Sequence, residues 1–179
     1  GNASGSYNYG VAVRDVTGKS GTVSVANGSL GITGVGSGAA NGVGVFIGDY
    51  FGGAGTTEAL VQATGNANTV VIRGTGAAGT GSSNLGIVVN AGADIIVAKH
   101  SLAMTGSGGN ASTGSNNHGI QIDGAGTTIQ QTSAATAANI SITGQSFSGG
   151  DSEGVFVSGT ARITSASALG AGASGQIQI

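Results

Sequence analysis

The chain has no cysteine, proline or tryptophan, and it has few charged or aromatic residues. Of its 179 residues, 7% are charged and 4% are aromatic, and the formal net charge is -2. Without cysteine, a disulfide framework and thiolate metal sites are excluded. The weak charge leaves no basic patch for nucleic acid and no polybasic segment for anionic lipid. No run approaches the roughly 18 apolar residues of a membrane-spanning helix, so we expect neither nucleic-acid binding nor membrane insertion.

Glycine, in contrast, is abundant, with 38 residues. Gly- and Ser-rich segments are typical of flexible linkers. Disordered chains, however, are poor in β-branched residues and rich in charge, whereas this chain has many Val and Ile residues and little charge. The composition therefore indicates a chain that packs a core.

A short pattern recurs along the chain, in which a glycine precedes two apolar residues spaced two apart. Its glycines are Gly10, Gly44, Gly86, Gly119 and Gly154. A second set of short β-type segments follows at 22–25, 60–63, 94–97, 128–131 and 162–165. A third set lies at 29–34, 69–74, 101–106, 139–144 and 175–179. The sequence thus contains five repeats of three strands each.

Side chains alternate between the two faces of a strand, so apolar residues two apart share one face. The residues expected to point inward on the first set of strands are Val11, Val13, Val45, Ile47, Ile87, Val89, Ile120, Ile122, Val155 and Val157. On the second set they are Val23, Val25, Ile95, Val97, Ile129 and Ile163. On the third they are Leu30, Ile32, Val70, Ile72, Leu102, Met104, Ile140, Ile142, Ile177 and Ile179. The outward residues between them are small or polar: Gly31, Ala103, Ser141, Gln121, Gln130 and Gln178.

These patterns predict an all-β fold, a three-sided parallel β-helix of about five coils of roughly 36 residues, with residues 1–179 forming one solenoid segment. A long loop rich in Gly, Asn and Ser is expected between each third strand and the next first strand. The stretch 1–11 nearly copies the loop at 109–120. We therefore expect a slice of a longer array with uncapped ends, which further copies or adjoining coils would extend end to end.

The corner after the first strand has a polar residue in every repeat: Asp15, Asp49, Asn90, Asp123 and Ser158. Asp and Asn commonly bond the backbone of turns, so a ladder of Asx-turns is the expected role. A cation bound between stacked carboxylates, at the corner of Asp15, Asp49 and Asp123, stays open as an alternative. The calcium-binding nonapeptide of β-rolls does not recur.

His118 and Glu153 precede the strand-starting glycines of adjacent repeats, so stacking would bring them close enough for an exposed ion pair. A general acid and base pair is conceivable there, but no third orienting group recurs beside it. His100 and Lys99 are interpreted as a solvated corner, and Arg14, Arg73 and Arg162 are scattered. We predict no catalytic residue, no cofactor-binding residue and no metal ligand, and hence no enzyme activity.

The aromatic residues are Tyr7, Tyr9, Phe46, Tyr50, Phe51, Phe147 and Phe156. Phe46 and Phe156 fall on outward positions of the first strands. Outward aromatic residues indicate that this face is covered by the long loop or by a neighbouring molecule. Alternatively, they form a contact surface for a sugar or a protein.

The strand ladders, with their Gly, Asn, Ser and Thr corners, low charge and missing Cys and Pro, resemble the β-helical passenger regions of type V secreted proteins. These are the autotransporters and haemagglutinin-like exoproteins of Gram-negative bacteria. The resemblance implies secretion through an outer membrane, a cell-surface or extracellular location, and an adhesive or structural role, with a host-surface or glycan ligand.

The function expected from these observations is an extracellular structural segment, a rod, stalk or filament, that stacks end to end. The leading alternative is a β-helical polysaccharide lyase or hydrolase, which clustered carboxylates on one face would favour. An ice-binding solenoid would require a flat array of Thr-x-Thr, whereas the outward positions here are mixed.

Overall fold

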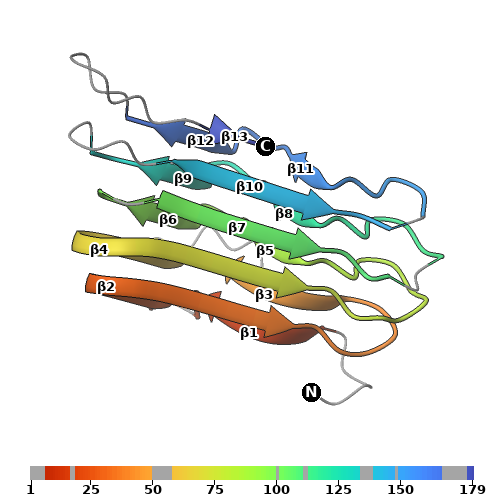
Figure 1. Ribbon diagram of the computed structural model, residues 1–179. Helices are drawn as coiled ribbons and strands as arrows, with labels where there is room; N and C mark the ends of the chain where they lie inside the picture. The colour runs from red at the N-terminus through yellow and green to blue at the C-terminus, as the bar shows by residue number, and fades with distance from the viewer. Residues whose placement is uncertain are drawn as a thin grey trace.

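The computed structural model is a parallel β-solenoid, and no helix occurs in the part of the chain that it describes (Figure 1). The structure describes residues 7–16, 19–49, 58–99, 101–110, 113–133, 139–147, 149–166 and 177–179, without the side chains of 66–68. Tyr50, Phe51 and His100 lie outside these residues. The predicted all-β, three-sided parallel β-helix is confirmed.

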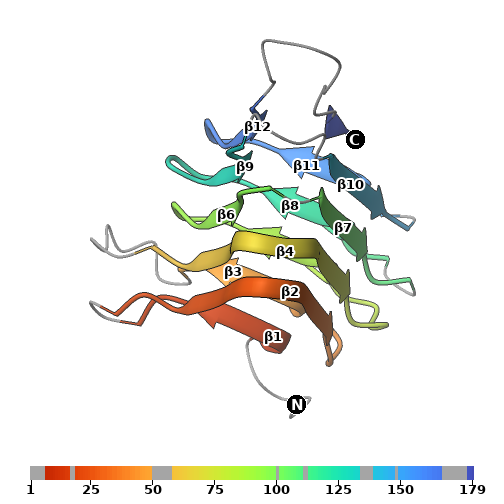
Figure 2. The same cartoon turned by 60° about the vertical axis from the view of Figure 1, so that its left-hand side comes forward.

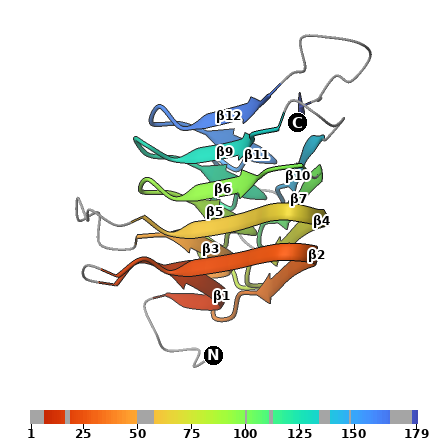
Figure 3. The same ribbon diagram turned by 90° about the vertical axis from the view of Figure 1, so that its left-hand side faces the viewer.

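Five strands stack in parallel on the first side of the solenoid. They are β1 (Asn8–Arg14), β3 (Gly42–Gly48), β5 (Ile87–Val89), β8 (Ile120–Ile122) and β11 (Val155–Val157). The remaining strands form one continuous sheet that bends over the other two sides (Figure 2). The strands of its second side are β6 (Asp94–Val97), β9 (Thr128–Gln131) and β12 (Arg162–Ser165), and those of its third side are β7 (Ser101–Ser107), β10 (Ile140–Gln145) and β13 (Ile177–Gln178). The long strands β2 (Thr22–Val35) and β4 (Leu60–Thr75) cover both of these sides (Figure 3).

The register pairs like residues of successive coils, as predicted. On the first side, Val45 pairs with Val11 and with Ile87, and the row continues through Ile120 to Val155. The chain completes about four turns rather than five. In the last coil, β11 and β12 are as long as the corresponding strands of the two coils before it, and only β13, with 2 residues, is shorter.

One aliphatic core fills the axis, and most of the residues predicted to point inward are part of it or pack against it. The exceptions are at the C-terminal end, where Val157 is 43%, Ile177 42% and Ile179 68% exposed. No described coil covers them. Val61, Ala63, Ala59 and Ala93 are buried in the core without having been predicted. Gln131 is buried at an inward position, where its Oε1 accepts a hydrogen bond from Ser165 Oγ at 3.2 Å.

The corner between the second and third sides differs from the prediction in the first two coils. There β2 and β4 run through the corner without a break, because the bend is made at Gly28 and Gly65, with φ of 91° and 71°, beside two register shifts. A bulge bends a strand while the ladder continues on either side of it. In the third coil, β6 and β7 are separate strands.

The corner between the third and first sides is built from two stacked rows of glycine. One row lies one residue before the ends of β2, β4, β7 and β10, at Gly34, Gly74, Gly106 and Gly144, and the other consists of the repeat glycines. A Cβ atom on any residue of the first row would overlap the carbonyl oxygen of a repeat glycine: Gly44, Gly86, Gly119 or Gly154. Only glycine allows two backbones to approach so closely. This corner positions the long loops over the outer face of the first sheet.

Candidate functional site

The outer face of the first sheet contains aromatic, aliphatic, amide, imidazole and carboxylate side chains. Its central row consists of Ala12, Phe46, Val88, Gln121 and Phe156, and the row immediately before the repeat glycines consists of Tyr9, Val43, Leu85, His118 and Glu153. At its N-terminal part, Val43, Phe46 and Val88 form a second apolar cluster against Tyr9 and Leu85. Phe46 is therefore covered within the chain itself, and its ring lies 4.9 Å from that of Tyr9.

At the C-terminal part of this face, His118 and Phe156 stack, with ring centroids 4.8 Å apart and planes inclined by 7°. Phe156 is only half-buried, whereas His118 is 4% exposed. The two aromatic residues predicted to be outward therefore have different surroundings. Phe147 is half-buried and belongs neither to the aliphatic core nor to the apolar cluster of Val43, Phe46 and Val88.

The structure brings His118 and Glu153 together, as the repeat spacing predicts. His118 Nδ1 lies 2.6 Å from Glu153 Oε2 and 3.1 Å from the backbone nitrogen of Glu153. Two proton-free acceptors repel each other at 2.6 Å, so the contact with the carboxylate requires a proton between Nδ1 and Oε2. Burial lowers the pKa of His118 below its usual value, although the carboxylates of Glu153 and Asp151 oppose this shift. We conclude that burial dominates and that the imidazole is neutral at pH 7.

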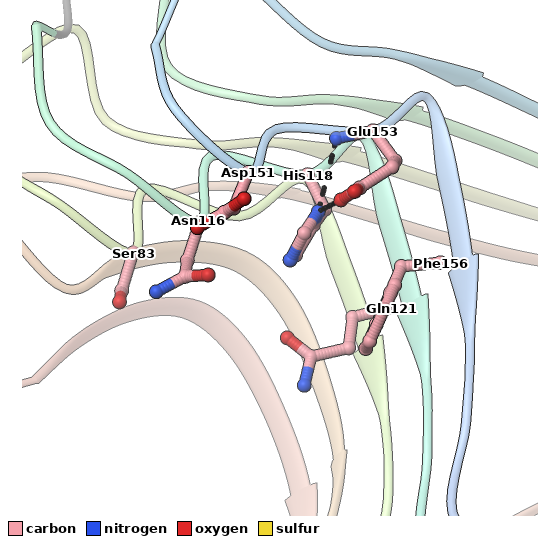
Figure 4. Close-up of a pocket in the computed structure, with 7 residues that line it drawn as sticks. All are labelled: Ser83, Asn116, His118, Gln121, Asp151, Glu153 and Phe156. Atoms are coloured by element: carbon pink, nitrogen blue, oxygen red, sulfur yellow. Dashed lines mark hydrogen bonds and ion pairs between the residues drawn. The ribbon is translucent and has the colours of Figure 1, made fainter.

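An open pocket of about 510 Å³ surrounds this pair. Figure 4 shows the loop residues Ser83, Asn116 and Asp151 on one side of it, and the strand residues Gln121 and Phe156 on the other. A second pocket of about 230 Å³ continues toward the N-terminal coil and is lined by Tyr7, Tyr9, Asn41, Val43, Phe46, Ser83, Leu85, Val88, Asn90 and Gln121. The two pockets share Ser83 and Gln121. They therefore form one groove along the first sheet, which we call the lateral groove.

The loop side of the lateral groove consists of residues with left-handed backbone conformation. They are Asn41, Ser83, Asn116 and Asp151, with φ of 54°, 60°, 57° and 50°. Each stands three residues before a repeat glycine. Our sequence analysis did not single them out, although aligning the repeats on that glycine would have shown a polar residue in four successive coils.

Next to this row, two asparagine side chains are completely buried. Asn84 Oδ1 accepts a hydrogen bond from the backbone N–H of Gly42 at 3.0 Å, and Asn117 Oδ1 accepts one from the N–H of Asn84 at 2.9 Å. Ser152 Oγ then accepts from the N–H of Asn117 at 3.1 Å. Because these bonds connect one coil to the next, they hold the long loops in register beside the groove.

The corner after the first strand contains the predicted polar row. Asp15 is buried, and Asp49, Asn90 and Asp123 are half-buried. Thr127 Oγ1 donates to the carbonyl oxygen of Asp123 at 2.6 Å, while the Asp123 carboxylate accepts from Gln121 Nε2 at 2.8 Å. Among the described residues, no group of three or more His, Asp or Glu side chains is placed to hold a metal ion.

The basic residues do not gather at a site. Arg14, Arg73 and Arg162 are exposed on three different strands, β1, β4 and β12, and Lys99 is exposed at the corner after β6. None of them lines either pocket of the lateral groove.

Comparisons with protein-family models, with curated proteins and with solved structures find no match to this chain. A search of the described residues finds no helix with the length and hydrophobicity needed to cross a membrane.

Proposed function

We propose that this chain is a structural segment of an extracellular rod, stalk or filament, extended by further copies of itself or by adjoining coils stacked end to end. The observation that supports the proposal is that within the described residues the outermost strands have a partner on one side only. These strands are β1 and β2 at one end, and β11, β12 and β13 at the other. Their free backbone groups offer a template for another coil.

The apolar core also supports stacking, because it continues to both ends. Val11 and Leu30 at one end and Val155 and Ile163 at the other are only partly buried, and Val157 is 43% exposed. Burial of apolar surface stabilises association by roughly 25 cal/mol per Å² removed from water. A further coil in register would bury these side chains and pair the open ladders together.

The extracellular role is proposed because the fold is stabilised without disulfide bonds and extends along one axis. Each coil is held by backbone ladders and aliphatic packing, and the chain contains no cysteine. Such a solenoid converts chain length into a stiff axial distance of about 4.8 Å per coil. Together with the resemblance to type V secreted passengers, this favours a surface adhesin or fibre that projects what its loops bind.

Stacking is tested with a variant that places charge on the C-terminal edge, V157K/I177K. The matched control, Q62K/A103K, adds the same charge at outward positions on the sides of the solenoid, where Ala103 pairs with the uncharged Val71 and Ser141 in the ladder. In light scattering and electron microscopy, we expect wild type and control to form particles that lengthen along one axis with concentration. The edge variant should stay short. Compact wild-type particles at every concentration would contradict the proposal.

One observation favours an enzyme as a second candidate function. His118 and Glu153 are in contact inside an open pocket, with Asp151 in its wall, which is compatible with a polysaccharide lyase or hydrolase. The test is an assay of acidic and neutral glycans with wild type, Glu153→Gln and Asp123→Asn. Cleavage that Glu153→Gln abolishes would establish this alternative in place of a purely structural role.

A further inference from the structure

The lateral groove has the form of a binding site for a linear ligand. Its two pockets follow the first sheet, along which each coil lies about 4.8 Å beyond the last. It lies on the side of the solenoid and not at an end. End-to-end stacking would therefore leave the groove open, so ligand binding there does not depend on the proposed rod.

The loop side of the groove retains side chains where glycine would be less strained. A left-handed φ is uncommon for residues other than glycine, and among these only Asn, Asp and His are clearly enriched in that region. Elsewhere in the described residues, positive φ occurs at eight glycines and, among other residue types, only at Ala91 and Thr160. Yet four successive coils place Asn41, Ser83, Asn116 and Asp151 there. A polar side chain at each of these points is therefore maintained at a conformational cost, and all four line the groove.

The chemistry of the lining selects a class of ligand. Hydroxyl, amide and carboxylate groups from Ser83, Asn116 and Asp151 face Gln121 and the half-buried ring of Phe156. Hydroxyl and amide groups both donate to and accept from sugar hydroxyls, a carboxylate accepts from them, and an aromatic ring packs against an apolar face. No Lys or Arg lines the groove, whereas Asp151 and Glu153 do, so an acidic polymer would be repelled.

An extended peptide fits less well. Peptides that bind sheets usually add a strand to an open edge, where main-chain groups are free. The groove lies on the face of the first sheet, whose inner strands β3, β5 and β8 already pair on both sides. Recognition here must come from side chains, which favours a ligand rich in hydroxyl groups.

We propose that the lateral groove binds a neutral glycan chain lying parallel to the solenoid axis. Sugar hydroxyls bond to the loop row of Ser83, Asn116 and Asp151 and to Gln121, and a sugar ring packs against Phe156. Because the groove spans several coils, an oligosaccharide binds more tightly than a single sugar. The structural core beneath the groove does not change on binding.

Residue types that occur at equivalent positions of other coils can be exchanged without disturbing the fold. Val88 occupies the central row next to Gln121, so Gln121→Val and Phe156→Val place an accepted residue in that row. The matched control is Gln130→Ile on the second side, where the same row contains Ile96. Thermal unfolding of each variant establishes that the solenoid is intact.

The probes are maltohexaose, cellohexaose and chitohexaose, with hexagalacturonate as the acidic counterpart. Binding is measured by calorimetry and by tyrosine fluorescence, since Tyr7 and Tyr9 line the groove and the chain has no tryptophan. We expect at least one neutral hexasaccharide to bind, with the monosaccharide and hexagalacturonate at least tenfold weaker. Gln121→Val and Phe156→Val should each weaken binding by at least tenfold, and Gln130→Ile should not.

Three results would overturn the proposal: no binding of any of the three neutral hexasaccharides, equal binding of hexagalacturonate, or unchanged affinity in both groove variants. A shortened oligosaccharide recovered after incubation would replace simple binding by the enzyme alternative. Particle length in electron microscopy is a separate readout. Gln121→Val is the variant used for it, because Gln121 lies in β8, which pairs on both sides, and the end strands are unaltered. Failure of glycan binding and failure of stacking are thus distinguishable.

Discussion

The carbonyl oxygen of Gly86 occupies the space that a Cβ atom on Gly74 would require. Gly74 is the second-to-last residue of β4, and Gly86 directly precedes β5, so the two glycines form the corner at which one turn passes into another. The same contact recurs at Gly106 with Gly119. The corner is therefore as tightly specified as the core, although it contains no side chain.

Gly74→Ala should destabilise the solenoid strongly, because the added methyl group meets backbone that cannot move without displacing the adjoining coil. We expect a loss of about 3 kcal/mol in the free energy of unfolding, at the upper end of typical overpacking costs. Chemical denaturation followed by circular dichroism measures it. Gly31→Ala is the matched control, because Gly31 lies on the outer face of the same side with open space around it. Equal stability of the two variants would refute this account of the corner.

Asn84→Ala should also destabilise the fold, because it removes the acceptor for the N–H of Gly42 and the donor to the carbonyl oxygen of Gly81 at 3.0 Å. A buried polar group left without a partner costs about 1–3 kcal/mol. Asn110→Ala, at an exposed asparagine, should cost much less. Hydrogen exchange of the Gly42 amide should accelerate in the first variant alone. An unchanged rate there would show that the asparagine row does not hold the loop.

His118 should make stability dependent on pH. Since burial lowers its pKa in the folded protein, the unfolded protein binds more protons as pH falls through the usual value of 6.5. Its contribution to the free energy of unfolding is therefore complete above that value and is lost as pH falls through the lowered, folded-state pKa. We expect His118→Leu, which places the residue type of Leu85 in the same row, to be less sensitive between pH 7.5 and 5.5. Titration of the His118 ring by NMR provides the pKa directly. If the free energy of unfolding of wild type instead rose relative to that of His118→Leu as pH falls, the Glu153 carboxylate, and not burial, would dominate the His118 pKa.

Duplicating one coil should lengthen the solenoid without disturbing it. Ile87 pairs with Ile120, so a second copy of residues 87–119 would place every ladder in register again. We expect a particle longer by about 4.8 Å and a melting temperature at least as high as that of the original, since interior coils are paired on both sides. A duplication shortened by one residue serves as the control, because a one-residue slip turns inward side chains outward. Small-angle scattering distinguishes the two outcomes.

The three ladders and most core residues were predictable because they depend only on the alternation of side chains and on the repeat spacing. The conformation of the loops was not. Whether Asn84 is buried or solvated depends on contacts with the coils before and after it, and its residue type alone favours an exposed turn. Gln131 was missed for a similar reason, since an inward polar side chain is stable only where Ser165 and backbone carbonyls satisfy it. His118 and Glu153 were found because their contact follows from the repeat, whereas the rest of the lateral groove required the shape of the loops.

The ladder hydrogen bonds join each coil only to those immediately before and after it, so resistance to opening should vary with position along the axis. Strands β5 and β6 in the middle pair on both sides, while β1 and β12 at the two ends pair on one. Loss of structure should therefore begin as fraying at the termini and advance inward coil by coil, so that the central turn is the last to melt.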